Sequence, residues 1–256
     1  MARSPAVTAP TPLDVTIAPA GSGRIAAVCT VAELFPVPER DLMSGIDKRP
    51  VQGPITLLPH GVLGDVQGDR ENHGGIFKAV YAFSREVREA YAAARRQELP
   101  DGSFGENLVT TGQDTDETVI GERWRVGTAE LEATCPRNPC GTFAAWMRDR
   151  RWGRSFTAGG RAGAYFRVLT KGRTSPGDAI EVLHRPSHGV TIGDAFRGLD
   201  PDRARALLDW AAGTETVLYD SLARAALIAL ERAGHGAEFP VRLRSTGRGI
   251  GLGMGL

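Results

Sequence analysis

The chain has 256 residues, 41% of them hydrophobic and 24% charged, which is enough for one large all-β domain or two small domains. Its 31 Lys and Arg nearly balance its 30 Asp and Glu, so the net charge of +1 gives no whole-chain field that would attract nucleic acid or an anionic membrane. The odd, low number of cysteines argues against a secreted disulfide framework, and no window approaches the roughly 18 apolar residues of a membrane span, so we expect a soluble, cytoplasmic protein.

Residues 1–22 are rich in Ala, Pro, Thr and Ser, and we expect a disordered leader there. Between residues 23 and 186, short apolar runs alternate with turns that contain Gly, Pro or Asp, a spacing typical of a closed or sandwich-like β-domain. The 32 Gly and 16 Pro of the chain also suit many short strands better than a helical bundle. The expected strands are Arg24–Val31, Ile55–Leu58, Lys78–Phe83, Leu108–Thr110, Arg123–Val126, Ala129–Thr134, Ala164–Leu169 and Ala179–Leu183.

Two helices are expected to interrupt these strands. Ser84 is a residue type that caps helix N-termini, and apolar residues recur after it at helical spacing as far as Glu98. Thr142 is the expected cap of a shorter helix that ends near Arg150. We therefore predict a mainly β domain of the α+β class over 23–186, with short helices.

After Pro186 the pattern becomes helical, and we expect a small helical region over 187–240. Asp200 and Pro201 are residue types that start a helix, and glycine ends that run at position 213. A further helix is expected from Thr214 to Gly234. Glycine recurs at short intervals over 241–256, and we predict a flexible tail there.

The loop Thr134–Cys140, which contains two prolines, is the most informative segment for function. Proline removes backbone donors and fixes local angles, so a stiff loop is expected to present Cys140 close to the start of the following helix. A helix N-terminus and a nearby Arg both favour the thiolate, the form that binds metals or attacks sulfur. A cysteine with a purely structural role in the loop is an equally good interpretation of Cys140. Cys135 could form a redox pair with Cys140, although disulfide geometry is strict, and the ligands for a tetrahedral zinc site are lacking.

Three further polar segments are candidates for binding. His73 ends a loop, 64–75, that contains four glycines, which let backbone approach a ligand closely; a polar turn with a solvated histidine is the alternative. Asn107 lies in Phe104-Gly105-Glu106-Asn107-Leu108, which could equally be a turn. Arg167 is an arginine inside an apolar strand and needs a partner or a pocket; it could bind phosphate or face outward.

Taken together, these segments resemble the MOSC domain, named for the C-terminal domain of molybdenum cofactor sulfurases, and most closely its YiiM-like subgroup. The order and approximate spacing of the motifs hold over residues 45–185, and the helices over 187–234 resemble the three-helix region that follows the domain in that subgroup. The matching segments are Lys48–Gly53, Gly64–Gly75, Phe104–Leu108, Pro136–Cys140 and Tyr165–Leu169.

The resemblance implies a β-barrel-like fold that holds a molybdenum cofactor, molybdopterin with its metal, and reduces N-hydroxylated compounds. It makes Cys140 the molybdenum ligand. It also implies that Lys48, His73, Asn107, Arg137 and Arg167 line the sites of the pterin phosphate or oxo groups. We see no flavin, haem or iron–sulfur motif, so the expected partners are a small-molecule substrate and an external electron donor protein. No nucleic acid or membrane partner is expected, and a homodimer is an assembly that the sequence allows.

One departure from the family pattern raises an alternative function. Cys135 stands where the subgroup usually has Gln or a similar polar residue. The additional thiol raises the hypothesis of a sulfur carrier or sulfur-transfer enzyme that uses a persulfide on Cys140 or Cys135, and makes both cysteines, with His73, candidate catalytic residues. A non-catalytic binding module that keeps the pocket is the remaining alternative.

Overall fold

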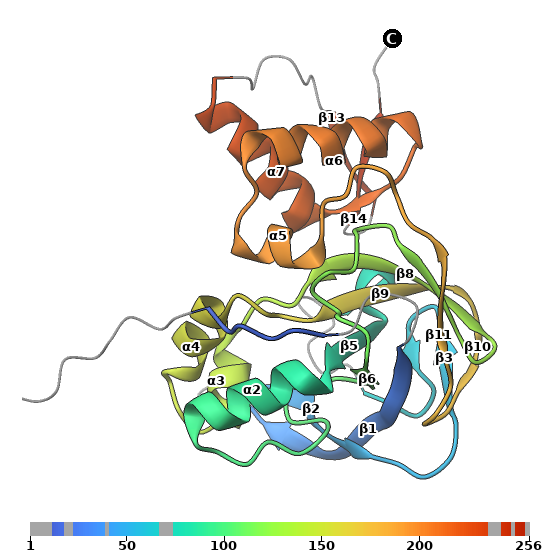
Figure 1. Ribbon diagram of the computed structural model, residues 1–256, viewed down its shortest axis with the longest axis vertical. Coiled ribbons are helices and arrows are strands. Elements are labelled where there is room, and N and C mark those ends of the chain that lie inside the picture. Colours follow the sequence, from blue (N-terminus) through green and yellow to red (C-terminus); the bar gives the residue numbers. More distant parts are fainter. Residues whose placement is uncertain are drawn as a thin grey trace, which may run out of the picture.

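The structure, a computed structural model, describes residues 12–17, 23–38, 41–66 and 74–234 and the backbone of 242–246 and 249–253. A curved sheet forms the lower part of the molecule in Figure 1, with helices α2 (Arg85–Arg95), α3 (Gly141–Trp146) and α4 (Trp152–Gly159) beside it. Helices α5 (Ile192–Arg197), α6 (Pro201–Gly213) and α7 (Asp220–Arg232) lie above strands of this sheet. The predicted α+β class, mainly β with short helices and a helical C-terminal region, is confirmed.

Eight strands form one mixed sheet in the order β11-β7-β8-β9-β5-β6-β1-β2. Neighbouring strands are antiparallel except β5 and β6, which are parallel. The strands are β1 (Arg24–Pro36), β2 (Met43–Pro50), β5 (Val80–Ser84), β6 (Leu108–Thr111), β7 (Arg123–Val126), β8 (Ala129–Pro136), β9 (Ala164–Thr170) and β11 (Ile180–His184). A smaller sheet contains β10 (Gly172–Thr174), β3 (Ile55–Leu58) and β4 (Gly61–Val62). All eight predicted strands are present, whereas β2, β4 and β10 were not predicted.

The large sheet curves so far that the start of β1 lies next to β11, the strand at one edge of the sheet. Arg24 forms an isolated antiparallel bridge with Ala179, and the Ile180 N–H donates to the Gly23 carbonyl at 2.9 Å. The start of β1 therefore lies beside the edge strand β11, while its far half pairs with β2. The continuous strand ladder remains open between β11 and β2, so the domain is barrel-like without a full ladder around its circumference.

The strands bury two different hydrophobic clusters, one on each face of β5. Val80 and Ala82 point into a cluster that consists mainly of aliphatic residues and is called the aliphatic cluster below; it also contains residues of α6 and α7. Tyr81 and Phe83 point into an aromatic cluster beneath α2, α3 and α4. Because successive strand residues face opposite sides, the five buried residues of β5 connect the two cores. Tyr81 thereby reaches the cavity described below.

The helices near the sheet differ from their predicted limits. Helix α2 follows Ser84 as expected but ends at Arg95, because Arg96 adopts a left-handed conformation (φ 49°) that ends the helix. The Ser84 hydroxyl donates to the Gln113 carbonyl at 2.9 Å and makes no capping bond. The N-cap of α3 is Cys140, so the prediction of Thr142 as its cap is wrong.

In the C-terminal region the predicted start at Asp200 is confirmed, and the Asp200 carboxylate accepts from the Arg203 N–H at 2.9 Å. The predicted helix start at Thr214 is wrong. Helix α7 begins at Asp220, because the chain first turns and forms β12 (Leu218–Tyr219), which pairs with β14.

The segment predicted as a flexible tail holds two strands, β13 (Arg242–Thr246) and β14 (Gly249–Gly253), which pair with each other. The alternation of glycine with Ile250 and Leu252 has the two-residue period of a strand. The boundary proposed near residue 186 stays a prediction. Within the described ranges, no helix combines the length and apolar character needed to cross a bilayer.

Candidate functional site

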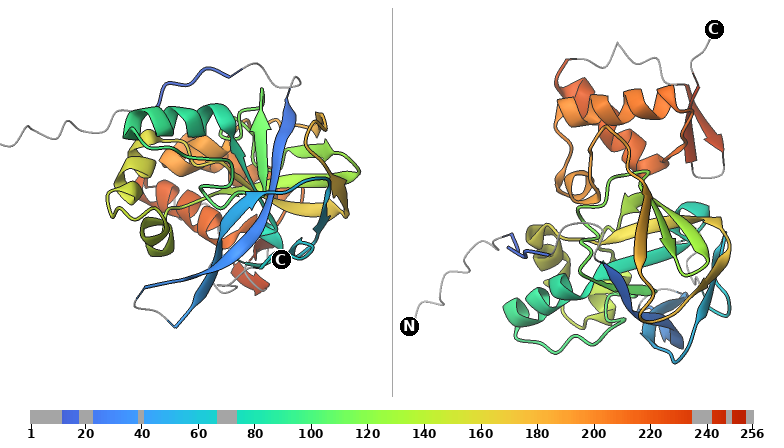
Figure 2. Two further views of the ribbon diagram at one scale, coloured as in Figure 1. Left: turned by 90° about the horizontal axis from the view of Figure 1, so that it is seen from below. Right: turned by 45° about the vertical axis from the view of Figure 1, so that its right-hand side comes forward.

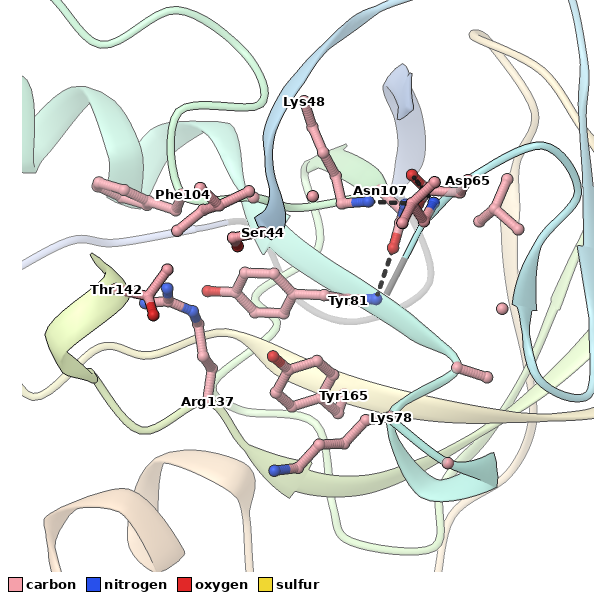
Figure 3. A pocket seen from close by; sticks show the side chains of 18 of the residues that line it. Ser44, Lys48, Asp65, Lys78, Tyr81, Phe104, Asn107, Arg137, Thr142 and Tyr165 are labelled. Atoms are coloured by element: carbon pink, nitrogen blue, oxygen red, sulfur yellow. Dashed lines mark hydrogen bonds and ion pairs between the residues drawn. The ribbon is translucent and has the colours of Figure 1, made fainter. Parts of the chain in front are cut away.

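A cavity of about 600 Å³ opens between β2, the turn after β3, β5, β9 and the loop that leads into α3. Figure 3 shows Lys48, Asn107 and Asp65 on one side of it and Arg137 and Thr142 on the other. The volume lies in the range of small-molecule and cofactor sites, which is roughly 300–1,000 Å³. The described residues that line it include four of the predicted site residues: Lys48, Asn107, Arg137 and Cys140.

Cys140 is a half-buried residue at the end of the stiff loop after β8, and it lines the cavity. Its extended backbone (φ −130°, ψ 173°) ends the loop and leads directly into α3. All three cysteines of the chain belong to the described ranges, and none forms a disulfide. Of these thiols, Cys140 is the one that lines the cavity.

Arg137 carries a buried positive charge at the cavity. Its side chain lies against aromatic rings, with the guanidinium carbon 4.2 Å from the centre of the Phe143 ring. The residue is 6% exposed, and its Nη1 is buried without a hydrogen-bond partner among the described residues. A buried donor nitrogen without a polar partner is costly, so Nη1 is suited to an anionic group that enters the cavity.

Lys48 and Asn107 meet at the carboxylate of Asp65 on the opposite side. Asp65 Oδ2 forms an ion pair with Lys48 Nζ and accepts from Asn107 Nδ2 at 2.8 Å. Asp65 Oδ1 accepts from the backbone N–H groups of Val31 and Val66, both at 3.0 Å. Burial lowers the pKa of Lys48, although the Asp65 carboxylate acts in the opposite direction. Three chain segments are thus joined at one buried acidic side chain.

Glu106 explains why the Phe104–Leu108 motif forms a fixed loop. Its buried carboxylate accepts from the backbone N–H groups of Gly102 at 2.8 Å and Phe104 at 2.9 Å. Gly102 has a φ of +90°, and a Cβ there would lie 2.1 Å from the Lys48 carbonyl oxygen. The loop therefore packs directly on β2, which places Asn107 next to Asp65.

Aromatic side chains form the remaining floor of the cavity. The hydroxyl of Tyr81 donates to the Ala162 carbonyl at 2.8 Å, and the rings of Tyr81 and Tyr165 are 5.0 Å apart. Burial raises the pKa of both phenols, so they remain neutral near pH 7. Lys78 Nζ lies 5.5 Å from the centre of the Tyr165 ring and 4.6 Å from that of Tyr219.

The other predicted site residues are not brought into this cavity or cannot be placed. Cys135 is 2% exposed in β8, and burial raises the pKa of its thiol to about 11. Arg167 pairs with Glu132 across β8 and β9, with Nη2 2.6 Å from Oε1. Neither residue lines the cavity. His73 lies outside the described residues.

Sequence reasoning missed the roles of Asp65, Tyr81 and Tyr165. Asp65 stood within the glycine-rich loop of the predicted site, but its neighbourhood gave no sign that it would contact residues 48 and 107. Tyr165 stood within a recognised motif. Tyr81 belonged to a strand predicted only as core, and nothing local distinguished it. The described residues contain no cluster of three or more His, Cys, Asp or Glu that could hold a metal ion.

Comparison with known proteins gives a consistent result. The profile of the MOSC domain family matches residues 69–181. YflK of Bacillus subtilis, described as uncharacterized, is 33% identical over 158 residues, which are 62% of this chain and 72% of that protein. YiiM of Escherichia coli is 29% identical over 157 residues, 59% of this chain and 69% of that protein.

A fungal protein described as a reductase, from Gibberella moniliformis, is 33% identical over 184 residues. The match covers 70% of this chain but only 31% of the fungal protein. Among solved structures, YiiM from Geobacillus stearothermophilus superposes with a TM-score of 0.65 at 22% identity, covering 81% of this chain and 99% of that structure. The structure of YiiM from Escherichia coli superposes with a TM-score of 0.61 at 22% identity, covering 82% of this chain and 94% of that structure. At this identity the structural likeness concerns the fold.

Proposed function

The chain belongs to the MOSC domain family, and on that premise we propose that it is an oxidoreductase that binds a molybdenum cofactor and reduces N-hydroxylated compounds. Cys140 is the proposed protein ligand of the metal. The reductase description of the fungal relative supports the reaction class. The observation that carries the proposal is the pairing, in one cavity, of the Cys140 thiol with the buried, unpartnered Nη1 of Arg137.

The residues present fit such a cofactor. A pterin-based cofactor carries a phosphate, and phosphate is bound best by charge-assisted donors such as a guanidinium. Arg137 offers that donor from a position with no competing carboxylate within 4.0 Å among the described residues. A thiolate is a soft anionic ligand that suits a redox-active metal. When bound, the cofactor would supply two-electron redox chemistry that no protein side chain provides.

The chain's own residues then have distinct tasks. Arg137 binds and orients the anionic part of the cofactor, and the aromatic residues Tyr81 and Tyr165 limit access of water to the floor of the cavity. In this proposal, electrons reach the site from an external donor protein. The proposal also places the protein in the cytoplasm. The substrate binds in the same cavity, whose lining also includes residues of β2 and of the turn after β3.

The test is the metal content of purified protein. Wild-type chain produced in cells that make the cofactor is expected to contain molybdenum, and Cys140→Ala is expected to lose most of it, measured by inductively coupled plasma mass spectrometry. Cys135→Ala is the matched control, because it removes a thiol five residues away that does not line the cavity, and it should retain the metal. Wild-type protein without molybdenum, or equal content in Cys140→Ala, would contradict the proposal.

The sulfur-transfer alternative finds no support in the position of Cys135. A thiol that is 2% exposed and has its pKa raised to about 11 is protonated near pH 7, and the thiolate is the reactive form. Cys135 is therefore unsuited to carry a persulfide. A non-catalytic binding module would retain molybdenum but fail to convert an amidoxime to its amidine, so the metal analysis and a turnover assay separate these hypotheses.

A further inference from the structure

The two cations on opposite sides of the cavity, Lys48 and Arg137, differ in how their charges are balanced. Lys48 Nζ forms an ion pair with Asp65, and the two side chains are only 10% and 6% exposed. Arg137 has a buried nitrogen without any hydrogen-bond partner among the described residues. Lys48 and Asp65 together add no net charge, so Lys48 is poorly suited to bind an anion. Its role in the cavity must differ from that of Arg137.

The carboxylate of Asp65 is held independently of the lysine. Besides Lys48, it accepts hydrogen bonds from Asn107 Nδ2 at 2.8 Å and from the backbone N–H groups of Val31 and Val66 at 3.0 Å. If Lys48 released a proton, these three donors would still stabilise the buried carboxylate. The neutral amine would keep its place by hydrogen bonding to Asp65. The arrangement therefore allows Lys48 to lose and regain a proton without moving.

The groups around Lys48 determine the pH at which this happens. Asp65 follows β4 and Glu106 belongs to the loop before β6, and both carboxylates would raise the pKa of Lys48. The thiol of Cys29, in β1, has its own pKa raised by burial and therefore adds no charge. Burial opposes them and is the larger effect, so the pKa of Lys48 is lowered from its ordinary value. A proton donor works best when its pKa approaches the working pH, and this direction of shift favours that role.

We propose that Lys48 donates a proton to the leaving hydroxyl oxygen of the substrate and that Asp65, fixed by Asn107, is the residue that positions its ammonium. The inference rests on the proposed reduction of N-hydroxylated compounds. In that reaction the N–O bond breaks, the nitrogen gains two electrons from the external redox protein, and two protons are consumed. One proton passes from Lys48 Nζ to the departing oxygen, which leaves as water, and the other reaches the nitrogen from solvent. Lys48 is reprotonated from solvent through the open cavity.

The first experiment needs no cofactor. The chain contains only three lysines, Lys48, Lys78 and Lys171, so protein labelled with ¹³C at the lysine Cε gives three signals that can be titrated by NMR. The signal that disappears in Lys48→Arg is assigned to Lys48. In the wild type this signal is expected to titrate at lower pH than that of the exposed Lys171. In Asp65→Asn the Lys48 signal is expected to titrate at a still lower pH. A Lys48 signal that titrates with or above Lys171, or that Asp65→Asn leaves unmoved, would overturn the inference.

The second experiment uses cofactor-loaded protein, with benzamidoxime as substrate and reduced methyl viologen as electron source. The kcat is expected to fall with rising pH at the midpoint measured for Lys48, and Asp65→Asn should move this fall to lower pH. Lys48→Arg keeps the charge but cannot donate a proton, so its kcat should drop by at least about 100-fold, the lower end of the usual contribution of a general acid, with little change in KM.

Asp114→Asn is the matched control, because Asp114 also belongs to a nearly buried ion pair, with Arg161 Nη2 at 2.5 Å, but does not line the cavity. It should lower thermal stability without moving the pH profile. A loaded Lys48→Arg variant with wild-type kcat would overturn the proton-donor role alone. Wild-type protein that contains no molybdenum would instead overturn the proposed function, and the proton-donor role with it.

Discussion

Cys135 and Cys140 lie five residues apart, yet their environments differ completely. Cys135 still belongs to β8, where its side chain is buried between strands, whereas Cys140 lies beyond the prolines at the edge of the cavity. Burial in an apolar environment disfavours a thiolate, so these two positions separate a structural thiol from one that can bind a metal. The decisive difference is where the strand ends, after Pro136.

Arg137 leads to a prediction about cofactor retention. Arg137→Met removes a buried charge that has no hydrogen-bond partner at Nη1, so cofactor-free protein should be at least as stable as wild type in thermal unfolding. The same variant should retain less than about a tenth of the wild-type molybdenum, since it loses a charge-assisted contact of about 1.5–3 kcal/mol.

Arg161→Met is the control for this experiment. Arg161 is similarly buried but pairs with Asp114, so its removal should lower the melting temperature and leave the metal content unchanged. Full metal content in Arg137→Met would show that this arginine does not bind the cofactor.

The buried carboxyl group of Asp116 leads to a prediction about how the stability of the fold depends on pH. It is fully buried, and burial raises the pKa of its carboxyl from 3.8 to about 6, although the Ala162 N–H donates to it at 2.6 Å. A raised folded-state pKa stabilises the fold below the unfolded pKa, and this contribution is lost as pH rises through about 6.

Asp116→Asn should remove that loss. Measured by urea denaturation between pH 4 and 6, the free energy of unfolding of Asp116→Asn should rise relative to wild type by up to about 3 kcal/mol, from roughly 1.4 kcal/mol per pKa unit. A constant difference between the two proteins across this range would contradict the assignment.

At the scale of elements, the signals for helix ends were reliable only where the capping residue had no stronger competing contact. Asp200 caps α6 as predicted. Ser84 precedes α2 but its hydroxyl bonds to the Gln113 carbonyl and lies 3.1 Å from that of Thr115. Thr142 and Thr214 have the same chemistry as true N-caps, but Thr142 lies inside α3 and Thr214 directly follows α6. Local residue type therefore identifies candidates, and tertiary contacts select among them.

The Asp200 cap gives a prediction for α6. Asp200→Ala removes the acceptor of the Arg203 N–H, and the loss of such a cap costs about 1 kcal/mol. The free energy of unfolding from chemical denaturation should fall by that amount. Asp209→Ala, an exposed change in the same helix, is the control and should have a smaller effect. Equal effects of the two substitutions would argue against a capping role.

At the scale of the whole molecule, the cavity is surrounded by parts of both cores. The aromatic cluster supplies Tyr81, Phe104 and Ile46 to its lining. The aliphatic cluster runs from the sheet into α6 and α7, so the C-terminal helices share a core with the barrel-like sheet, as their position above β8 and β9 indicates in Figure 1 and in the right-hand view of Figure 2. We therefore expect these parts to unfold together.

The sequence by itself determined the fold class, the positions of eight strands and the family, because each depends on patterns within short segments. Strand alternation, turn residues and ordered motifs are local properties that can be read along the chain. Its motifs also singled out Lys48, Asn107, Arg137 and Cys140, which line the same cavity in the structure; their role as a cofactor site stays a prediction.

Only the tertiary structure decided which polar residues share the cavity and how their charges are balanced. The contact of Asp65 with Lys48 and Asn107 joins positions 17 and 42 residues apart, and no local pattern encodes it. The ion pair that turns Arg167 to Glu132 depends on the register of β8 and β9. Burial, which separates Cys135 from Cys140 and lowers the pKa of Lys48, exists only once distant segments have packed.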